Sequence, residues 1–249
     1  MNIDLGGKRA IVAGGSRGIG RAIALAFAEA GAGVSICARG AERLAATHEE
    51  IARHGGTAHA AVCDLADEAA VPRYVEEAAA ALGGIDILVN NASGFGATDD
   101  EAGWAVSVSV DLLATVRAIR AALPYLEKSD AGAILNISSI SGLRATPRTP
   151  PYAAVKAAVI EYTLTQAAAL ARKGIRVNGI APGSIEFPGG TWERARLNNP
   201  DLYSRILRSI PFGRLGRPEE IAQVVLFLCS PLAGWVTGQN IAVDGGQML

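Results

Sequence analysis

The amino-acid sequence predicts a doubly wound α/β fold, in which seven parallel strands form a sheet with helices on both faces. Short apolar segments rich in Val and Ile alternate with helical patterns along all 249 residues. These segments are almost continuously apolar, as in strands buried on both faces of a sheet. Right-handed crossovers then place the helices on the two sides. Because no linker, low-complexity tract or fixed-period repeat interrupts the pattern, we expect a single domain, 1–249.

The expected elements alternate in chain order. The strands are 9–15, 33–39, 58–64, 85–93, 132–140, 175–183 and 240–246. The helices between them are 18–31, 41–54, 68–82, a long helix through Trp104 to about Leu126, 152–170 and 219–230. The stretch 184–200 shows neither pattern clearly and is expected to hold only short helices.

This irregular stretch follows the end of a strand, where open α/β sheets bind ligands. Long irregular segments in compact domains usually serve as lids or binding loops. We therefore expect a substrate lid at about 184–210. Its apolar and aromatic side chains favour a substrate with a sizeable apolar portion; they are Phe187, Trp192, Leu197 and Tyr203.

Composition excludes several classes of function. A formal net charge of −1 gives no electrostatic reason to expect a nucleic acid or an anionic membrane as partner. The N-terminus does not read as a signal peptide, and no apolar stretch reaches the roughly 18 residues of a membrane helix. Cys37, Cys63 and Cys229 are isolated in sequence, without metal or disulfide spacing. We expect reduced, buried thiols in a cytoplasmic protein and no metal site.

A glycine-rich turn, AGGSRGIG, joins the first strand to the first helix. Gly14, Gly18 and Gly20 allow a sharp turn and a close approach of the backbone to a pyrophosphate at the helix N-terminus. The second strand ends in Arg39 instead of the carboxylate that would bind a ribose hydroxyl. Arg39 and Arg17 suit a 2′-phosphate, so NADP(H) is expected and NAD(H) is the alternative.

Eight motifs occur in order along the chain: AGGSRGIG (13–20), CDL (63–65), NNAS (90–93), NISSISG (136–142), YAAVK (152–156), APG (181–183), RLGRPEEIA (214–222) and TGQNIAVDGG (237–246). Through them the whole sequence resembles the short-chain dehydrogenase/reductase family, and most closely the three-oxoacyl reductases and related alcohol dehydrogenases. The resemblance implies a Rossmann-type fold and a homotetramer.

The resemblance also implies three catalytic residues. Tyr152 would exchange a proton with the substrate oxygen, Lys156 would stabilise the phenolate and bind the nicotinamide ribose, and Ser139 would hold the substrate oxygen. An i, i+4 spacing places Tyr152 and Lys156 on one helix face. Ser138, the neighbour of Ser139, is expected to point elsewhere because strand residues alternate.

The cofactor residues carried over from the family are Gly14, Ser16, Arg17, Gly18, Ile19, Gly20, Arg39, Asp64, Leu65, Asn91, Ala92, Tyr152, Lys156, Pro182, Gly183 and Ile185. For Asp64 the alternative is a loop-capping role. Asn178 is expected to tie strands together.

Two positions depart from the family pattern. Ser93 stands where NNAG has glycine, and Asp111 stands where the family has an asparagine that holds a relay water. The Asp111 carboxylate could still accept hydrogen bonds from that water and support a charged Lys156, or it could disfavour the phenolate.

These observations predict an enzyme that moves a hydride between NADP(H) and a small-molecule carbonyl or secondary alcohol. The alternatives are a non-catalytic nucleotide sensor on the same scaffold, and a dehydratase or epimerase that uses its cofactor without net turnover.

Overall fold

A computed structural model describes residues 3–249, in which seven strands form one parallel sheet of order β3-β2-β1-β4-β5-β6-β7. The strands are β1 (Arg9–Ala13), β2 (Gly33–Ala38), β3 (Ala58–Val62), β4 (Ile87–Asn90), β5 (Ala133–Ile137), β6 (Arg176–Pro182) and β7 (Asn240–Val243). The strand order reverses between β1 and β4, so the predicted doubly wound arrangement is confirmed. Because every neighbouring pair is parallel, all carboxyl ends meet at one edge of the sheet.

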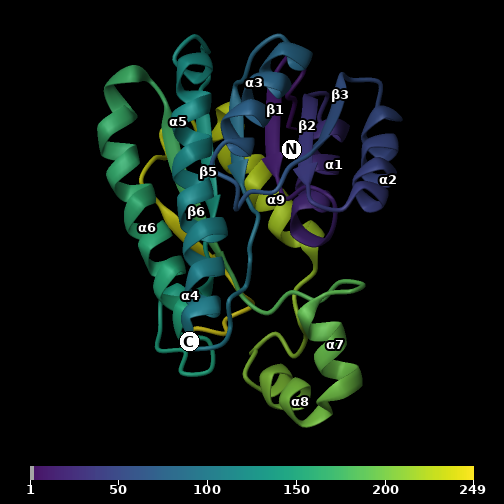
Figure 1. Ribbon diagram of the computed structural model, residues 1–249, viewed down its shortest axis with the longest axis vertical. Coiled ribbons are helices and arrows are strands. Elements are labelled where there is room, and N and C mark those ends of the chain that lie inside the picture. The colour runs from purple at the N-terminus through teal and green to yellow at the C-terminus, as the bar shows by residue number, and fades with distance from the viewer. Residues whose placement is uncertain (1–2) are drawn as a thin grey trace.

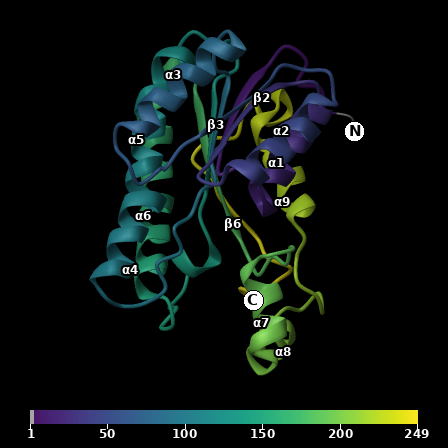
Figure 2. The ribbon, with the colours of Figure 1, turned by 45° about the vertical axis from the view of Figure 1, so that its right-hand side comes forward.

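Most of the helices lie in two layers with the sheet between them. The helices are α1 (Gly18–Glu29), α2 (Ala41–Ala52), α3 (Ala70–Leu82), α4 (Glu101–Val106), α5 (Ala114–Leu126), α6 (Pro150–Leu170), α7 (Thr191–Asn198), α8 (Pro200–Arg208) and α9 (Pro218–Cys229). Figure 2 shows α3, α4, α5 and α6 on one face and α1, α2 and α9 on the other.

Alternate strand residues supply the two halves of the core. In β1, Val12 is buried with the helices α1, α2 and α9, whereas Ile11 is buried with α3, α5 and α6. Strands covered on both faces in this way must be apolar at every position, which is why their sequence reads as continuous apolar runs. Within residues 3–249, no helix combines the length and the apolar character needed to cross a bilayer.

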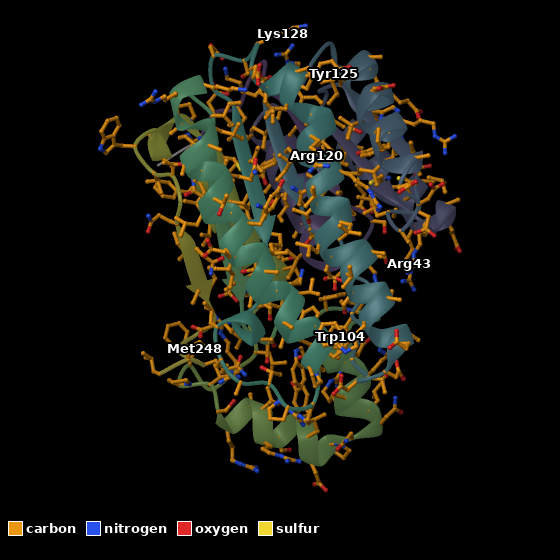
Figure 3. The ribbon with its side chains drawn as sticks, turned by 60° about the vertical axis from the view of Figure 1, so that its left-hand side comes forward. Arg43, Trp104, Arg120, Tyr125, Lys128 and Met248 are labelled. Atoms are coloured by element: carbon orange, nitrogen blue, oxygen red, sulfur yellow. The ribbon has the colours of Figure 1, made fainter. Side chains whose placement is uncertain are left out.

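The predicted long helix through Trp104 is interrupted. A π-helical turn, Ser107–Leu113, separates α4 from α5 and contains the buried Asp111. Figure 3 shows Trp104 on α4 and, further along, Arg120 and Tyr125 on α5, so this turn lies toward the Trp104 end. Such turns widen a helix by one residue and often occur at functional sites.

The segment after β6 holds short helices, as expected. Helix α7 lies within the stretch 184–200, where its bounds could not be predicted because its sequence TWERARLN has no apolar stripe. Neither α7 nor α8 contains a buried residue. Figure 1 shows this pair apart from both helical layers, at the end of the molecule to which the strands' carboxyl ends point.

Candidate active site

A cavity of about 880 Å³ lies at the carboxyl ends of the strands. Most of the predicted site residues line it: Ser139, Tyr152, Lys156, Gly14, Ser16, Arg17, Ile19, Gly20, Arg39, Asp64, Leu65, Asn91, Ala92, Pro182, Gly183 and Ile185. Of the predicted residues, Gly18 alone is missing from this wall. The size is in the range of ligand pockets, and the wall runs from the glycine-rich turn to the Tyr152 helix.

The glycine-rich turn forms a cradle suited to a phosphate. Gly14 has a φ of 77°, and a Cβ there would lie 2.9 Å from the Cα of Ala92, so glycine is required. The Asn91 side-chain amide donates to the Gly14 carbonyl oxygen over 3.0 Å and holds the turn. No side chain caps the first N–H groups of α1, which leaves them free to bind an anion.

A phenyl ring partly covers this cradle. A Cβ on Gly18 would lie 2.7 Å from Cζ of Phe187, so the ring is packed against the turn. This contact accounts for the absence of Gly18 from the cavity wall. The other predicted cofactor residues line the cavity, and the Phe187 ring packs on Gly18.

Arginines surround the same end of the cavity. Arg17, Arg39 and Arg43 line it, and burial together with the neighbouring guanidiniums of Arg43, Arg194 and Arg39 lowers the pKa of Arg17. Figure 3 shows Arg43 extending outward from the helical body. Arg43 and Arg194 were not predicted from the sequence, although Arg43 follows Arg39 by four residues and lies in the first turn of α2. Arg17 also donates to the carbonyl oxygen of Gly189 over 3.2 Å, which joins the turn to the segment before α7.

The structure shows the contacts of Asp64 and Asn178. Asp64 lines the cavity, but its Oδ1 accepts the Ala66 amide over 3.0 Å, so it also caps its own loop. The Asn178 side chain donates to Val236 O over 2.9 Å and accepts from Gln239 N over 3.1 Å. Asn178 therefore ties β6 to the segment before β7, as expected.

Lys156 is buried beside a carboxylate. Its Nζ donates to the Ile137 carbonyl over 3.0 Å and lies 3.0 Å from Asp111 Oδ1 and 5.6 Å from the centre of the Tyr152 ring. The Asp111 contact has the distance of an ion pair without the angle of a directed hydrogen bond, and the Coulomb attraction does not require that angle.

The contact between Asp111 and Lys156 is direct. A separation of 3.0 Å leaves no room for a water between the Lys156 ammonium and Asp111 Oδ1, so the carboxylate supports the charged Lys156 by direct contact. Burial acts to lower the pKa of Lys156, but the Asp111 carboxylate and then the Tyr152 phenol act against it, and the pKa lies above its ordinary value. Lys156 is therefore held as an ammonium.

The second Asp111 oxygen helps to hold a loop over Tyr152. Oδ2 accepts the Gly94 amide over 2.9 Å, and the Ser93 hydroxyl accepts the next amide, that of Phe95, over 3.1 Å. Asp111 and Ser93, the two residues that depart from the family pattern, thus both hold the short loop that contains Gly94 and Phe95.

The loop presents an aromatic ring to the predicted proton donor. Phe95 has a φ of 49°, a conformation that is uncommon for a bulky residue and is maintained by the contacts around it. Its ring packs edge-on against Tyr152, with ring centres 4.9 Å apart and planes at 63°. The Ser107 hydroxyl accepts the Gly96 amide over 3.1 Å, so the far side of the loop is also held. No periodic pattern in the sequence indicates a site role for Phe95, although it lies between two glycines.

The two serines at the end of β5 point in different directions. Ser138 Oγ lies 2.8 Å from Ile180 O and 2.9 Å from Asn240 Oδ1, so it bonds to β6 and β7 as strand alternation predicts. Ser139 Oγ accepts the Ser141 amide over 3.1 Å and lines the cavity with Tyr152.

Two of the three cysteines are neighbours in the structure. Cys37 and Cys63, which are isolated in sequence, meet at the ends of β2 and β3, and the interaction with Cys37 lowers the pKa of Cys63. All three cysteines are free and buried. In the described part of the chain, no group of three or more His, Cys, Asp or Glu side chains is arranged to hold a metal ion.

Comparisons with known proteins show which family this sequence resembles. The profile of the family described as Enoyl-(Acyl carrier protein) reductase matches residues 13–248. The chain is 39% identical over 255 residues to the 3-oxoacyl-(acyl-carrier-protein) reductase of Aquifex aeolicus, which covers 99% of this chain and 100% of that protein.

Solved structures show the same similarity. A 7α-hydroxysteroid dehydrogenase complexed with NADH and 7-oxo glycochenodeoxycholic acid matches with a TM-score of 0.91 and 37% identity, over 98% of this chain and 96% of that one. A short chain dehydrogenase from Burkholderia cenocepacia J2315 in complex with NADP matches with a TM-score of 0.90 and 34% identity, over 98% and 99% of the two chains.

Proposed function

The chain belongs to the short-chain dehydrogenase/reductase family of oxidoreductases, and on that premise we propose that it transfers a hydride between NADP(H) and a carbonyl or secondary alcohol. One observation carries the proposal. The cavity that begins at the glycine-rich turn ends at Ser139, Tyr152 and the buried, ion-paired Lys156. A nucleotide site and a proton donor are thereby joined in one space.

The side chains at this end divide the chemistry between them. The nicotinamide, when bound, supplies or accepts the hydride. The Ser139 hydroxyl hydrogen-bonds the substrate oxygen, and the Tyr152 phenol gives that oxygen its proton in reduction or takes the proton in oxidation. Lys156, held as an ammonium, stabilises the phenolate electrostatically.

NADP(H) is the proposed cofactor because positive charge gathers where a 2′-phosphate would lie. Arg17, Arg39 and Arg43 line the end of the cavity next to β2, and Arg binds phosphate through a fixed fork of donors. The relatives named above bind either NADH or NADP, so this preference depends on the arginines of this chain.

The segment 184–210 is the proposed lid. Phe187 and Trp192 line the cavity, as do Leu202 and Ile206 of α8, whereas Leu197 is 68% exposed and Tyr203 bonds Glu186 over 3.1 Å. Both the first part of the segment and α8 therefore contribute to the cavity wall. A cover with no buried residue in its helices can open and close at low cost and exclude water during the reaction.

A homotetramer remains the proposed assembly. Beyond the family resemblance, large apolar side chains lie exposed on α6, α9 and the β7 edge; they include Leu164, Phe227, Leu232, Trp235 and Ile241. Light scattering at micromolar concentration should give about four times the 25.6 kDa chain mass. A single species at the monomer mass would reject this proposal.

The function is tested by Tyr152→Phe, which removes the phenol proton and leaves the ring packed against Phe95. With NADPH and a panel of ketones, we expect turnover to fall roughly 10²–10⁴-fold while NADPH still binds. Unchanged turnover would reject the role of Tyr152. NADPH binding without oxidation by any ketone in the wild type would favour a nucleotide sensor, and a changed substrate without net NADPH oxidation would favour a dehydratase or epimerase.

A further inference from the structure

Two arginines stand at the substrate end of the cavity, apart from those at the nucleotide end. Arg144 and Arg148 come from the connection between β5 and α6, on the chain between Ser139 and Tyr152, and both line the cavity wall. Both are exposed, so they lie at its mouth.

Neither guanidinium is neutralised by the protein. Within residues 3–249, neither Arg144 nor Arg148 forms a salt bridge. Among the described residues that line the cavity, the one carboxylate is Asp64, which lies at the nucleotide end after β3. The Asp111 carboxylate is 0% exposed at its side chain and is paired with Lys156. The substrate end therefore carries uncompensated positive charge.

The Arg144 side chain is also held in place. Its Nη1 donates to the carbonyl oxygen of Gln247 over 3.1 Å. Gln247 is tied in turn to the start of the lid, because its side-chain oxygen accepts the Ser184 amide over 3.0 Å. Figure 3 places the next residue, Met248, toward the same end of the molecule as Trp104. A single bond to a carbonyl leaves the other Arg144 donors available to a ligand.

Apolar side chains form part of the remaining wall. They include Phe95, Ile140, Trp192, Leu202 and Ile206. An apolar body would bury its surface against these side chains, and an anionic group would bind the two guanidiniums, which match carboxylate and phosphate oxygens through paired N–H donors.

We propose that Arg144 and Arg148 form a subsite for an anionic group, and that the substrate is an apolar ketone or alcohol that carries a carboxylate or a phosphate ester. This inference rests on the proposed function, since it assigns the substrate class of the same site. The arginines determine specificity and take no part in the proton transfer.

The test compares aryl methyl ketones that share the acetophenone body and differ in the para group and its charge: 4-acetylbenzoate, its neutral methyl ester and 4-acetylphenyl phosphate. NADPH oxidation is followed with the wild type, with Arg144→Ala, Arg148→Ala and the double variant, and with Arg172→Ala as control. Arg172 is exposed in the turn after α6 and does not line the cavity.

We expect each single alanine variant to lower kcat/KM for the anionic ketones about tenfold, since a hydrogen bond to a charged group contributes on that scale, and to leave the ester unchanged. Lysine at both positions should recover part of the loss, and the two anionic ketones separate a carboxylate from a phosphate preference. Equal use of acid and ester by the wild type, or an equal fall for both in the variants, would overturn the inference.

Failure of the proposed function gives a different result, because then neither the acid nor the ester oxidises NADPH. Calorimetric binding of 4-acetylbenzoate, in the presence of NADP+, would still decide the subsite in that case. If each arginine variant weakens the binding of 4-acetylbenzoate about tenfold, the subsite is supported. If these variants leave that binding unchanged, the subsite is rejected.

Discussion

Replacing Asp111 by Asn should extend alcohol oxidation to lower pH. The carboxylate lies against Lys156, whose ammonium supports the phenolate of Tyr152, so the two charges act on the phenol with opposite sign. Asn keeps the shape of the side chain and can still accept the Gly94 amide, but it removes the negative charge that disfavours the phenolate.

The structure sets the size of the effect. Asp111 Oδ1 lies 3.0 Å from Lys156 Nζ, which lies 5.6 Å from the Tyr152 ring centre, so the carboxylate oxygen is at most 8.6 Å from that centre. Two unit charges at that distance interact by about 2 kcal/mol when the effective dielectric constant is about 20. That energy corresponds to about 1.4 pH units.

The assay is the initial rate of NADP+ reduction by a secondary alcohol between pH 6 and 10.5. Oxidation requires the phenolate, so the rate falls toward low pH, and the midpoint of that fall should move about 1.4 units lower in Asp111→Asn. Ketone reduction at pH 7 should change little. Asp130→Asn is the matched control, because Asp130 is 84% exposed at its side chain and pairs with Lys8.

Two results would refute this reasoning. If the pH midpoint of the oxidation rate stays within about 0.3 pH units of the wild-type value, the charge of the carboxylate acts on the phenol more weakly than the assumed dielectric constant implies. A midpoint at higher pH would mean that Lys156, left buried without its counter-ion, loses its proton and its support of the phenolate. That outcome would make the Asp111 charge a requirement of catalysis.

Three further predictions concern the cofactor site and stability. Arg39→Asp should narrow or reverse an NADPH preference in kcat/KM, through lost phosphate pairing and new repulsion, and an unchanged ratio would contradict it. Phe187→Thr should lower the Kd for NADPH in fluorescence titrations, because it uncovers Gly18; a weaker complex would show that the ring supports the cofactor. Hydrogen bonds from Arg214 and the Arg217 amide lower the pKa of Glu220 to about 2, so its stabilisation is complete above pH 4.5 and is lost as the pH falls toward 2. Glu220→Gln should therefore lower the urea midpoint at pH 7 and have little effect near pH 2, and an equal deficit at both would contradict the ion-pair origin.

Much of the fold was predictable because strands buried on both faces impose an apolar pattern that short turns interrupt. The order of elements follows from that pattern and from the handedness of crossovers. The interruption between α4 and α5 was not predictable, since a π-helical turn changes the hydrogen-bond partners without changing which residues are apolar. Short helices were expected in the stretch that holds α7, but its bounds could not be predicted because it buries no residue.

The site residues that were missed share a physical cause. The cavity is reached by Arg43 from a helix and by Arg144 and Phe95 from two loops. No spacing in the sequence shows that these residues come close to the site. Support of Lys156 by Asp111 was anticipated only through the family resemblance, and the direct contact could not be read from spacing because the two residues come from separate helical elements. Sequence patterns show what a residue can do, whereas the partner it meets depends on tertiary packing.

The central claim, hydride transfer with Tyr152 as proton donor, is tested most directly by isotope transfer. NADPH carrying deuterium at nicotinamide C4 on the transferred face is mixed with a ketone, and the alcohol product is analysed by mass spectrometry. We predict one deuterium on the carbinol carbon with the wild type, and a rate of label transfer roughly 10²–10⁴-fold lower with Tyr152→Phe at saturating cofactor. Product without deuterium from either face-labelled cofactor, or equal label transfer by both proteins, would contradict the account.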